Sequence, residues 1–135
     1  MYWTMKTCNI IYSSNGDLGV NQFNAVGTIQ TKGDLSLIKF SYKGDDSVAD
    51  YSFSILKNNV IRLTKKGDLN YSLTFDINSP CSTFADSMGF KLPLLVTTKN
   101  ISVNLTDSGL SLFLDYKLDI GGNISFEKIS LTVNF

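Results

Sequence analysis

The sequence predicts an all-β fold: one domain, residues 1–135, built as an antiparallel up-and-down barrel of about eight or nine strands. Composition is the first observation behind this prediction. The chain has one Glu and three Ala residues but is rich in Ser, Thr, Asn, Ile, Val and aromatic residues, which favours strands over helices. A recurring glycine turn is the second observation, and alternation of apolar and polar residues between the turns is the third.

The alternation places the strands in chain order, and each is expected to bury one face and expose the other. In the clearest of them, residues 69–77, every second residue is apolar. The predicted strands cover residues 3–13, 20–31, 35–43, 51–57, 60–66, 69–76, 92–105, 110–120 and 123–134. Short polar turns join them into a meander. The one long segment between strands, residues 78–90, is expected to form a short helix or a lid over one end of the barrel.

Four of the turns share a glycine followed by aspartate, at Gly16, Gly33, Gly44 and Gly67. Glycine adopts a positive φ without steric cost, and a tight hairpin turn requires a residue in that conformation. We expect each of these four glycines to supply the positive φ of its turn.

Three of the predicted strands change the parity of their apolar residues part-way along. The apolar residues switch between odd and even positions within 35–43, 92–105 and 123–134. One extra residue turns the following side chains to the other face of a strand, so each switch predicts a β-bulge. Long bulged strands allow a sheet to bend and close, which favours a barrel over a flat two-sheet sandwich.

The charge balance and the missing residue types exclude several functions. Twelve Lys and Arg residues balance twelve Asp and Glu residues, so the chain lacks the basic excess that binds nucleic acid or an anionic membrane surface. The absence of histidine removes Ser-His and Cys-His nucleophile pairs and most zinc sites. We therefore expect no enzymatic activity, no catalytic residue, no metal and no cofactor, and neither nucleic acid nor a membrane as a partner.

The N-terminal residues and the two cysteines bear on cellular location. Residues 1–11 include Lys6 and Thr7 where the apolar core of a signal peptide would need uninterrupted hydrophobic residues. We expect a cytoplasmic protein in which Cys8 and Cys81 are free thiols, because disulfides are rare in the cytosol.

The order of features along the chain resembles a known family. Residues 60–67 are followed by an alternating strand, by Phe84 and Gly89, and then by the segments 94–101 and 110–118. This pattern resembles the YwiB-like family of small bacterial proteins. The resemblance implies a calycin-like barrel, similar in shape to the lipocalins. It implies no activity, because the family is functionally uncharacterised.

Arg62 is the leading candidate for contact with a ligand, because it is the only arginine beside eleven lysines. A planar, bidentate donor suits a carboxylate or phosphate group. Its expected partners are Tyr42, Tyr71 and Tyr116, which fall on the apolar faces of their predicted strands. Arg62 has the opposite parity to its two neighbours, and if those are core residues it faces solvent instead.

Two functions remain open. The first is a carrier that binds a small apolar or amphipathic molecule in the barrel lumen, by analogy with the fold. The alternative is an interaction module with a filled core, which acts as a dimer or adaptor through an edge strand or an apolar patch from Trp3 or residues 84–90. We expect a monomer or a homodimer. The bulky residues that would fill the core are Phe40, Phe53, Phe75 and Phe126.

Overall fold

The computed structural model describes residues 4–44 and 47–135 and confirms the all-β fold. These residues form ten strands and one short 3-10 helix, η1 (Lys57–Asn59). The strands are β1 (Thr4–Gly16), β2 (Gly19–Lys32), β3 (Leu35–Lys43), β4 (Val48–Ile55), β5 (Ile61–Lys66), β6 (Tyr71–Phe75), β7 (Cys81–Ser87), β8 (Phe90–Thr106), β9 (Gly109–Ile120) and β10 (Asn123–Asn134). Every predicted strand is present close to its expected bounds. Trp3 lies outside the described residues.

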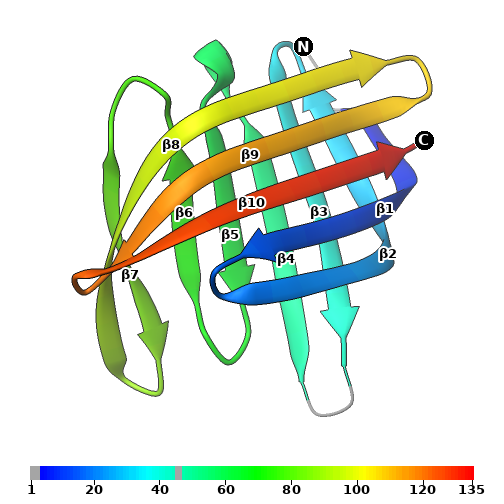
Figure 1. Ribbon diagram of the computed structural model, residues 1–135. Helices are drawn as coiled ribbons and strands as arrows, with labels where there is room; N and C mark the ends of the chain where they lie inside the picture. Colours follow the sequence, from blue (N-terminus) through cyan, green and yellow to red (C-terminus); the bar gives the residue numbers. More distant parts are fainter. Residues whose placement is uncertain (1–3, 45–46) are drawn as a thin grey trace.

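The ten strands form one antiparallel sheet that curls into a nearly closed barrel (Figure 1). Their order in the sheet is β6-β5-β4-β3-β2-β1-β10-β9-β8-β7, so the first strand of the chain pairs with the last. The two end strands, β6 and β7, meet at one bridge. There the backbone amides of Asn70 and Asp86 each donate to the carbonyl oxygen of the other residue, at 2.8 and 2.7 Å. We call this junction the β6–β7 seam.

Residues 81–87 form a strand, which corrects the expected helix or lid. This strand, β7, pairs with β8 along its whole length and brings the total to ten. Its inward face carries small residues, among them Ala85, whereas Phe84 projects outward and is 60% exposed. Because the bulky apolar residue points away from the core, the alternation that marks a half-buried strand is weak in the sequence here.

One of the three expected β-bulges is present. The register of β8 against β9 shifts between Thr98 and Asn100. The prediction of bulges in β3 and β10 is wrong, because both strands keep a continuous register with their neighbours. In β10 the inward residues are odd-numbered throughout, so Ser125 and Glu127 are buried while Phe126 is exposed. Polar residues on the inward face, rather than an inserted residue, cause the apparent change of parity in β10.

The turn glycines differ in part from the expectation. Gly33 adopts a positive φ of 61°, but Gly16, Gly44 and Gly67 do not, and in the first hairpin the positive φ of 117° belongs to Gly19. The missing side chain at Gly16 serves the packing of β10 instead, because a Cβ there would lie 2.3 Å from a backbone oxygen of that strand.

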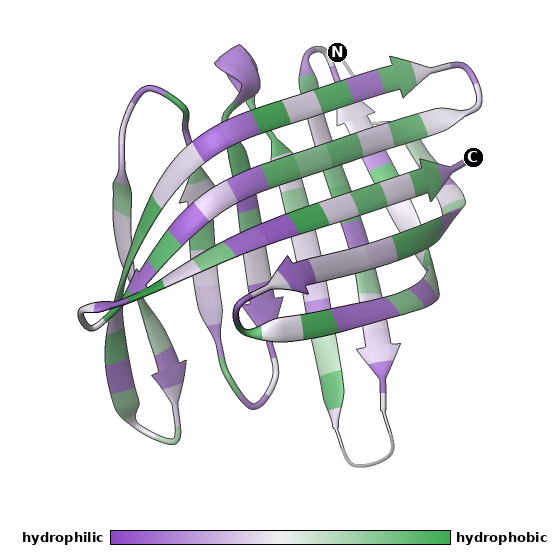
Figure 2. Ribbon diagram, viewed as in Figure 1, coloured by the Kyte–Doolittle hydropathy of each residue, from purple (hydrophilic) through white to green (hydrophobic). Residues whose placement is uncertain are grey.

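The core lies inside the barrel, and apolar and polar residues alternate along the strands that surround it (Figure 2). One side, formed by β1 to β4, holds an aromatic cluster with ring centroids 5.0 to 6.3 Å apart. The members of this aromatic cluster are Tyr12, Phe23, Phe40, Tyr51 and Phe53. Phe75 is also buried, but Phe126 lies outside the barrel, where the Nζ of Lys99 is 4.8 Å from its ring centroid. Three of the four phenylalanines expected in the lumen are therefore core residues.

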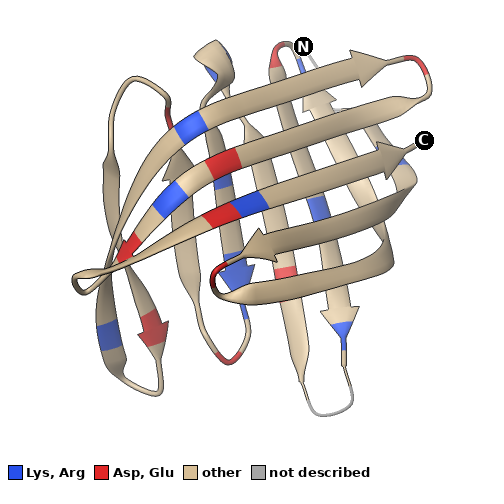
Figure 3. Ribbon diagram, viewed as in Figure 1, with Lys and Arg blue, Asp and Glu red and all other residues tan. Residues whose placement is uncertain are grey.

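The charged residues are distributed over the whole barrel. Figure 3 shows Lys and Arg interspersed with Asp and Glu along the strands, and the formal net charge is zero. No helix in the described ranges is long and apolar enough to cross a membrane.

Candidate ligand-binding cavity

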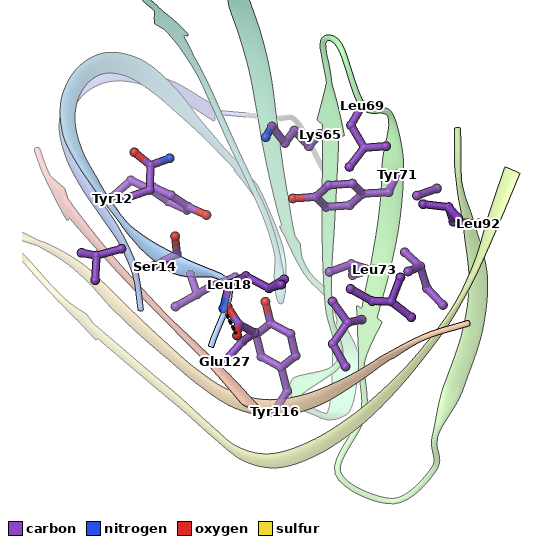
Figure 4. A pocket seen from close by; sticks show the side chains of 18 residues that line it. Tyr12, Ser14, Leu18, Lys65, Leu69, Tyr71, Leu73, Leu92, Tyr116 and Glu127 are labelled. Atoms are coloured by element: carbon purple, nitrogen blue, oxygen red, sulfur yellow. Dashed lines mark hydrogen bonds between the residues drawn. The ribbon is translucent and has the colours of Figure 1, made fainter. Parts of the chain in front are cut away.

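The barrel contains a partly open cavity of about 290 Å³ beside the aromatic cluster (Figure 4). Its apolar wall comes mainly from the second half of the chain and consists of Leu69, Leu73, Ala85, Leu92, Leu94, Leu118, Ile120 and Ile129. Leu18 of the turn between β1 and β2 and Val20 at the start of β2 are 65% and 73% exposed and therefore lie at the rim, as does the half-exposed Leu92 of β8.

The only glutamate of the chain lines this cavity. Glu127 points inward from β10 and is 7% exposed. Its Oε2 accepts one hydrogen bond from the hydroxyl of Ser125 at 2.6 Å and another from the backbone N–H of Leu18 at 3.2 Å, the second drawn in Figure 4. Among residues 4–44 and 47–135, no donor reaches Oε1 and no lysine or arginine pairs with the carboxylate. Two neutral donors compensate only part of the cost of removing this charge from water.

Gly16 provides the space that the Glu127 carboxylate occupies. The two residues are paired across β1 and β10. A Cβ at Gly16 would lie 2.4 Å from Oε2 of Glu127, which is shorter than any ordinary contact of a Cβ. Gly16 and the Leu18 N–H, two residues apart, thus form a niche around one carboxylate oxygen.

Three tyrosine hydroxyls converge on the cavity, from Tyr12 on β1, Tyr71 on β6 and Tyr116 on β9 (Figure 4). Burial raises the pKa of each phenol above its ordinary value of 10.0, in the case of Tyr12 to about 12. The negative charge of Glu127 adds to the effect of burial on the pKa of Tyr12 and Tyr116. The three phenols therefore keep their protons at neutral pH, and each hydroxyl both donates and accepts hydrogen bonds.

Lys65 contributes a positive charge to the same lining. It projects from β5, and its Nζ lies 5.6 Å from the ring centroid of Tyr51 and 5.9 Å from that of Tyr71. The faces of these aromatic rings attract the ammonium group. Lys65 and Glu127 therefore place opposite charges on the lining of one cavity without forming an ion pair with each other.

A row of polar residues runs across three strands beside the cavity. Tyr116 of β9 is paired with Glu127 of β10 on one side and with Thr98 of β8 on the other. Directly opposite side chains on one face of a sheet lie about 5 Å apart at their Cβ atoms. The Oγ1 of Thr98 is buried and has no hydrogen-bond partner within the described part of the chain. This side of the core thus holds polar groups whose hydrogen-bonding capacity is not used up by the protein.

Comparison with known proteins identifies the family. The family model described as a domain of unknown function (DUF1934) matches residues 5–133. The chain belongs to the DUF1934 family. Among solved structures, the crystal structure of the ywiB protein from Bacillus subtilis is similar to it, with a TM-score of 0.76 and 15% sequence identity over 98% of this chain and 92% of that chain. No curated protein matches the sequence significantly.

The match to ywiB confirms the expected YwiB-like resemblance and the barrel fold. At 15% sequence identity the similarity concerns the fold of the backbone, and it gives no information about the residues that line the cavity. The polar groups of the DUF1934 cavity therefore have to be understood from their own chemistry.

The structure brings two of the four predicted site residues together. Tyr71 and Tyr116 both line the cavity. Tyr42 is 40% exposed and packs on Phe23, with ring centroids 4.4 Å apart, outside the cavity lining. Arg62 is exposed between two buried neighbours on β5 and faces solvent, the second of its two expected placements. The inward cation of this strand is Lys65.

Four further polar residues line the cavity although the sequence did not indicate them as site residues: Tyr12, Ser14, Lys65 and Glu127. A signal for two of them was present in the parity of their strands. Lys65 has the parity of the buried residues of β5, and Glu127 has the parity of the buried residues at the end of β10. A polar residue at an inward position is a stronger indication of a site than a rare residue type at an outward one.

The described residues offer neither a metal site nor an activated thiol. No group of three or more His, Cys, Asp or Glu side chains in these ranges is placed to hold a metal ion. Cys8 and Cys81 lie outside the cavity lining, and burial raises the pKa of both thiols. A raised pKa keeps a thiol protonated and unreactive at neutral pH.

Proposed function

We propose that this DUF1934 protein binds a small amphipathic molecule in the lumen of its barrel. One observation carries the proposal: the lumen contains a cavity with an apolar wall and a polar end built from Glu127 and three tyrosine hydroxyls. Small-molecule sites typically combine a mostly apolar lining with a few convergent polar groups. The apolar wall would hold the hydrocarbon part of the ligand, and the polar end would orient its head group.

The size of the cavity favours this function over the alternative of a filled interaction module. About 290 Å³ is close to the lower end of the range of small-molecule pockets, roughly 300–1,000 Å³. A solid core would leave no such space. The feature that favours the interaction module is the exposure of Phe84 and Phe90 on the β7–β8 hairpin, at 60% and 77%.

We further propose that the protein binds its ligand without transforming it and does so in the cytoplasm. The support for binding alone is that neither cysteine lines the cavity and that burial keeps its phenols protonated. The support for the location is that Cys8 and Cys81 are both free thiols, as is usual in a reducing compartment.

The test of binding uses N-phenylnaphthylamine, a neutral apolar probe whose fluorescence rises on transfer from water to an apolar site. Leu92→Trp and, as a second variant, Ala85→Leu place extra bulk in the cavity from β8 and β7. The matched control is Leu95→Trp, on β8 but outside the cavity lining. We expect saturable binding by the wild type and the control, and about tenfold or weaker affinity in the cavity variants, a loss of at least about 1.4 kcal/mol.

Equal binding by wild type, Leu92→Trp and Ala85→Leu would contradict the proposal, because the probe would then bind elsewhere. Absence of saturable binding by the wild type would contradict it as well. If the wild type sediments as a stable dimer and binds no probe, the interaction module becomes the better account. Circular dichroism and thermal melting establish that each variant retains the fold.

A further inference from the structure

The most unusual group in the cavity is the buried carboxylate of Glu127. It is 7% exposed and has no cationic partner among the residues that the structure describes. Leaving a buried charge unpaired costs several kcal/mol, so proteins usually pair such a group or use it. None of the aspartates and lysines in the described ranges is buried, whereas the single glutamate of the chain is.

The surroundings of Glu127 hold it in one orientation and leave one oxygen open. Oε2 is fixed by the Ser125 hydroxyl and the Leu18 N–H, and Gly16 has no side chain that would displace it. Oε1 accepts nothing from the described residues, although Glu127 lines the cavity. Oε1 of Glu127 is therefore a hydrogen-bond acceptor held in a fixed position without a donor from the described residues.

The groups around the open oxygen suit a positively charged donor. The hydroxyl oxygens of Tyr12 and Tyr116 point into the same space and can accept hydrogen bonds (Figure 4). Their ring faces attract cations. An ammonium group has three N–H donors and no acceptor, and it would neutralise the charge of Glu127. An anionic head group at the same place would meet the repulsion of the carboxylate.

We propose that the ligand is an amphipathic amine, an inference that rests on the proposed function. Its ammonium group is bound at Oε1 of Glu127 between Tyr12 and Tyr116, and its hydrocarbon part lies against the leucine wall. Lys65 lines the same cavity between the rings of Tyr51 and Tyr71. Its charge disfavours a second cation there, so the ligand carries its positive charge at one end only.

The test compares three probes with the same eight-carbon chain: octylamine, octanol and octanoate, which are cationic, neutral and anionic at neutral pH. Affinities are measured by isothermal titration calorimetry. Glu127→Gln removes the charge and keeps the shape, and the amide oxygen can still accept the hydrogen bonds of Ser125 and Leu18. Asp115→Asn is the matched control, because Asp115 lies outside the cavity on the neighbouring strand, β9.

We expect the wild type to bind octylamine most tightly and octanoate most weakly. Glu127→Gln should weaken octylamine binding by about tenfold to a hundredfold, because hydrogen bonds to charged groups have that effect, and should change octanol binding by less than about threefold. Asp115→Asn should change neither. The ranking of the three probes on the wild type tests the proposal even if Glu127→Gln fails to fold.

The same variants separate a ligand that is not an amine from a lumen that binds nothing. If Leu92→Trp abolishes binding of octylamine and octanol but Glu127→Gln affects neither, the lumen is a binding site and the amine proposal is wrong. Tightest binding by octanoate would also overturn the amine proposal and would point to Lys65 as the anchoring residue. If neither the three probes nor N-phenylnaphthylamine bind, the proposed function is wrong and the amine proposal with it.

Discussion

At the scale of single residues, Gly16 and Glu127 depend on each other. The glycine lies opposite the glutamate across β1 and β10, and its missing side chain leaves room for the carboxylate. The backbone there does not have a positive φ, so the requirement for glycine is one of space. The Gly-Asp pattern suggests that Gly16 is needed for the conformation of a turn. The structure shows instead that it is needed for its small size, because the carboxylate of Glu127 packs against it.

Gly16→Ala tests this interdependence. Its Cβ would lie 2.4 Å from Oε2 of Glu127 and 2.3 Å from the Phe126 carbonyl oxygen, and we expect a loss of about 1–3 kcal/mol in the free energy of unfolding. Gly44→Ala is the control, because the nearest atom among the described residues, on the Tyr42 ring, would be an ordinary 3.5 Å from the new Cβ, and we expect a change within about 0.5 kcal/mol. Urea denaturation measures both. Equal effects of the two substitutions would show that the niche around Glu127 is not close-packed.

The buried tyrosines make stability depend on pH in the alkaline range. The unfolded chain loses the proton of Tyr12 near pH 10, whereas the folded protein holds it until about pH 12. The stabilisation is therefore fully present below pH 10 and is lost as the pH rises towards 12, by about 3 kcal/mol for Tyr12 alone. Denaturation of the wild type and of Tyr12→Phe over this range measures the contribution. Identical slopes for the two proteins would contradict it.

At the scale of elements, the sequence predicted where the strands lie, but it predicted only some of the residues that face inward. Alternation located β6 and β9 because apolar residues occupy every inward position there. In β10 the same pattern breaks at Ser125 and Glu127, and a parity switch in sequence has two causes, an inserted residue or a polar residue facing inward. Of the three described strands with a parity switch, β3, β8 and β10, only β8 contains the insertion, between Thr98 and Asn100. Sequence periodicity does not distinguish the two causes, and for that reason it missed Glu127 and with it the polar end of the cavity.

The β6–β7 seam is the least paired part of the barrel. Between these strands the only ladder contact in the described residues is the bridge of Asn70 and Asp86, whereas β9 is paired along its length on both sides. We expect the amides of β6 and β7 that face the seam to exchange with solvent faster than those of β9, because few hydrogen bonds must break to open them. Hydrogen exchange measured residue by residue by NMR tests this. Equal protection of β7 and β9 would show that the seam is closed.

At the scale of the whole molecule, closure of the sheet creates the cavity. Pairing of the first strand with the last brings Glu127 beside Gly16, which lies more than a hundred positions earlier in the sequence. The aromatic cluster fills the side of β1 to β4, and the smaller leucine and alanine side chains opposite leave the space next to it. The two-residue alternation and the composition predicted the barrel. The volume left empty inside it depends on how side chains from distant strands pack together, and no local sequence pattern contains that information.

Binding in the lumen is tested most directly by native mass spectrometry of gently purified wild-type protein beside Leu92→Trp, each with and without added N-phenylnaphthylamine. We expect the wild-type chain of 14.9 kDa to retain one small molecule, either copurified or the added probe, and this excess mass to disappear on denaturation and to be missing in Leu92→Trp. A wild-type chain that stays bare in every sample, or an excess mass equal in both proteins, would contradict a binding site in the lumen.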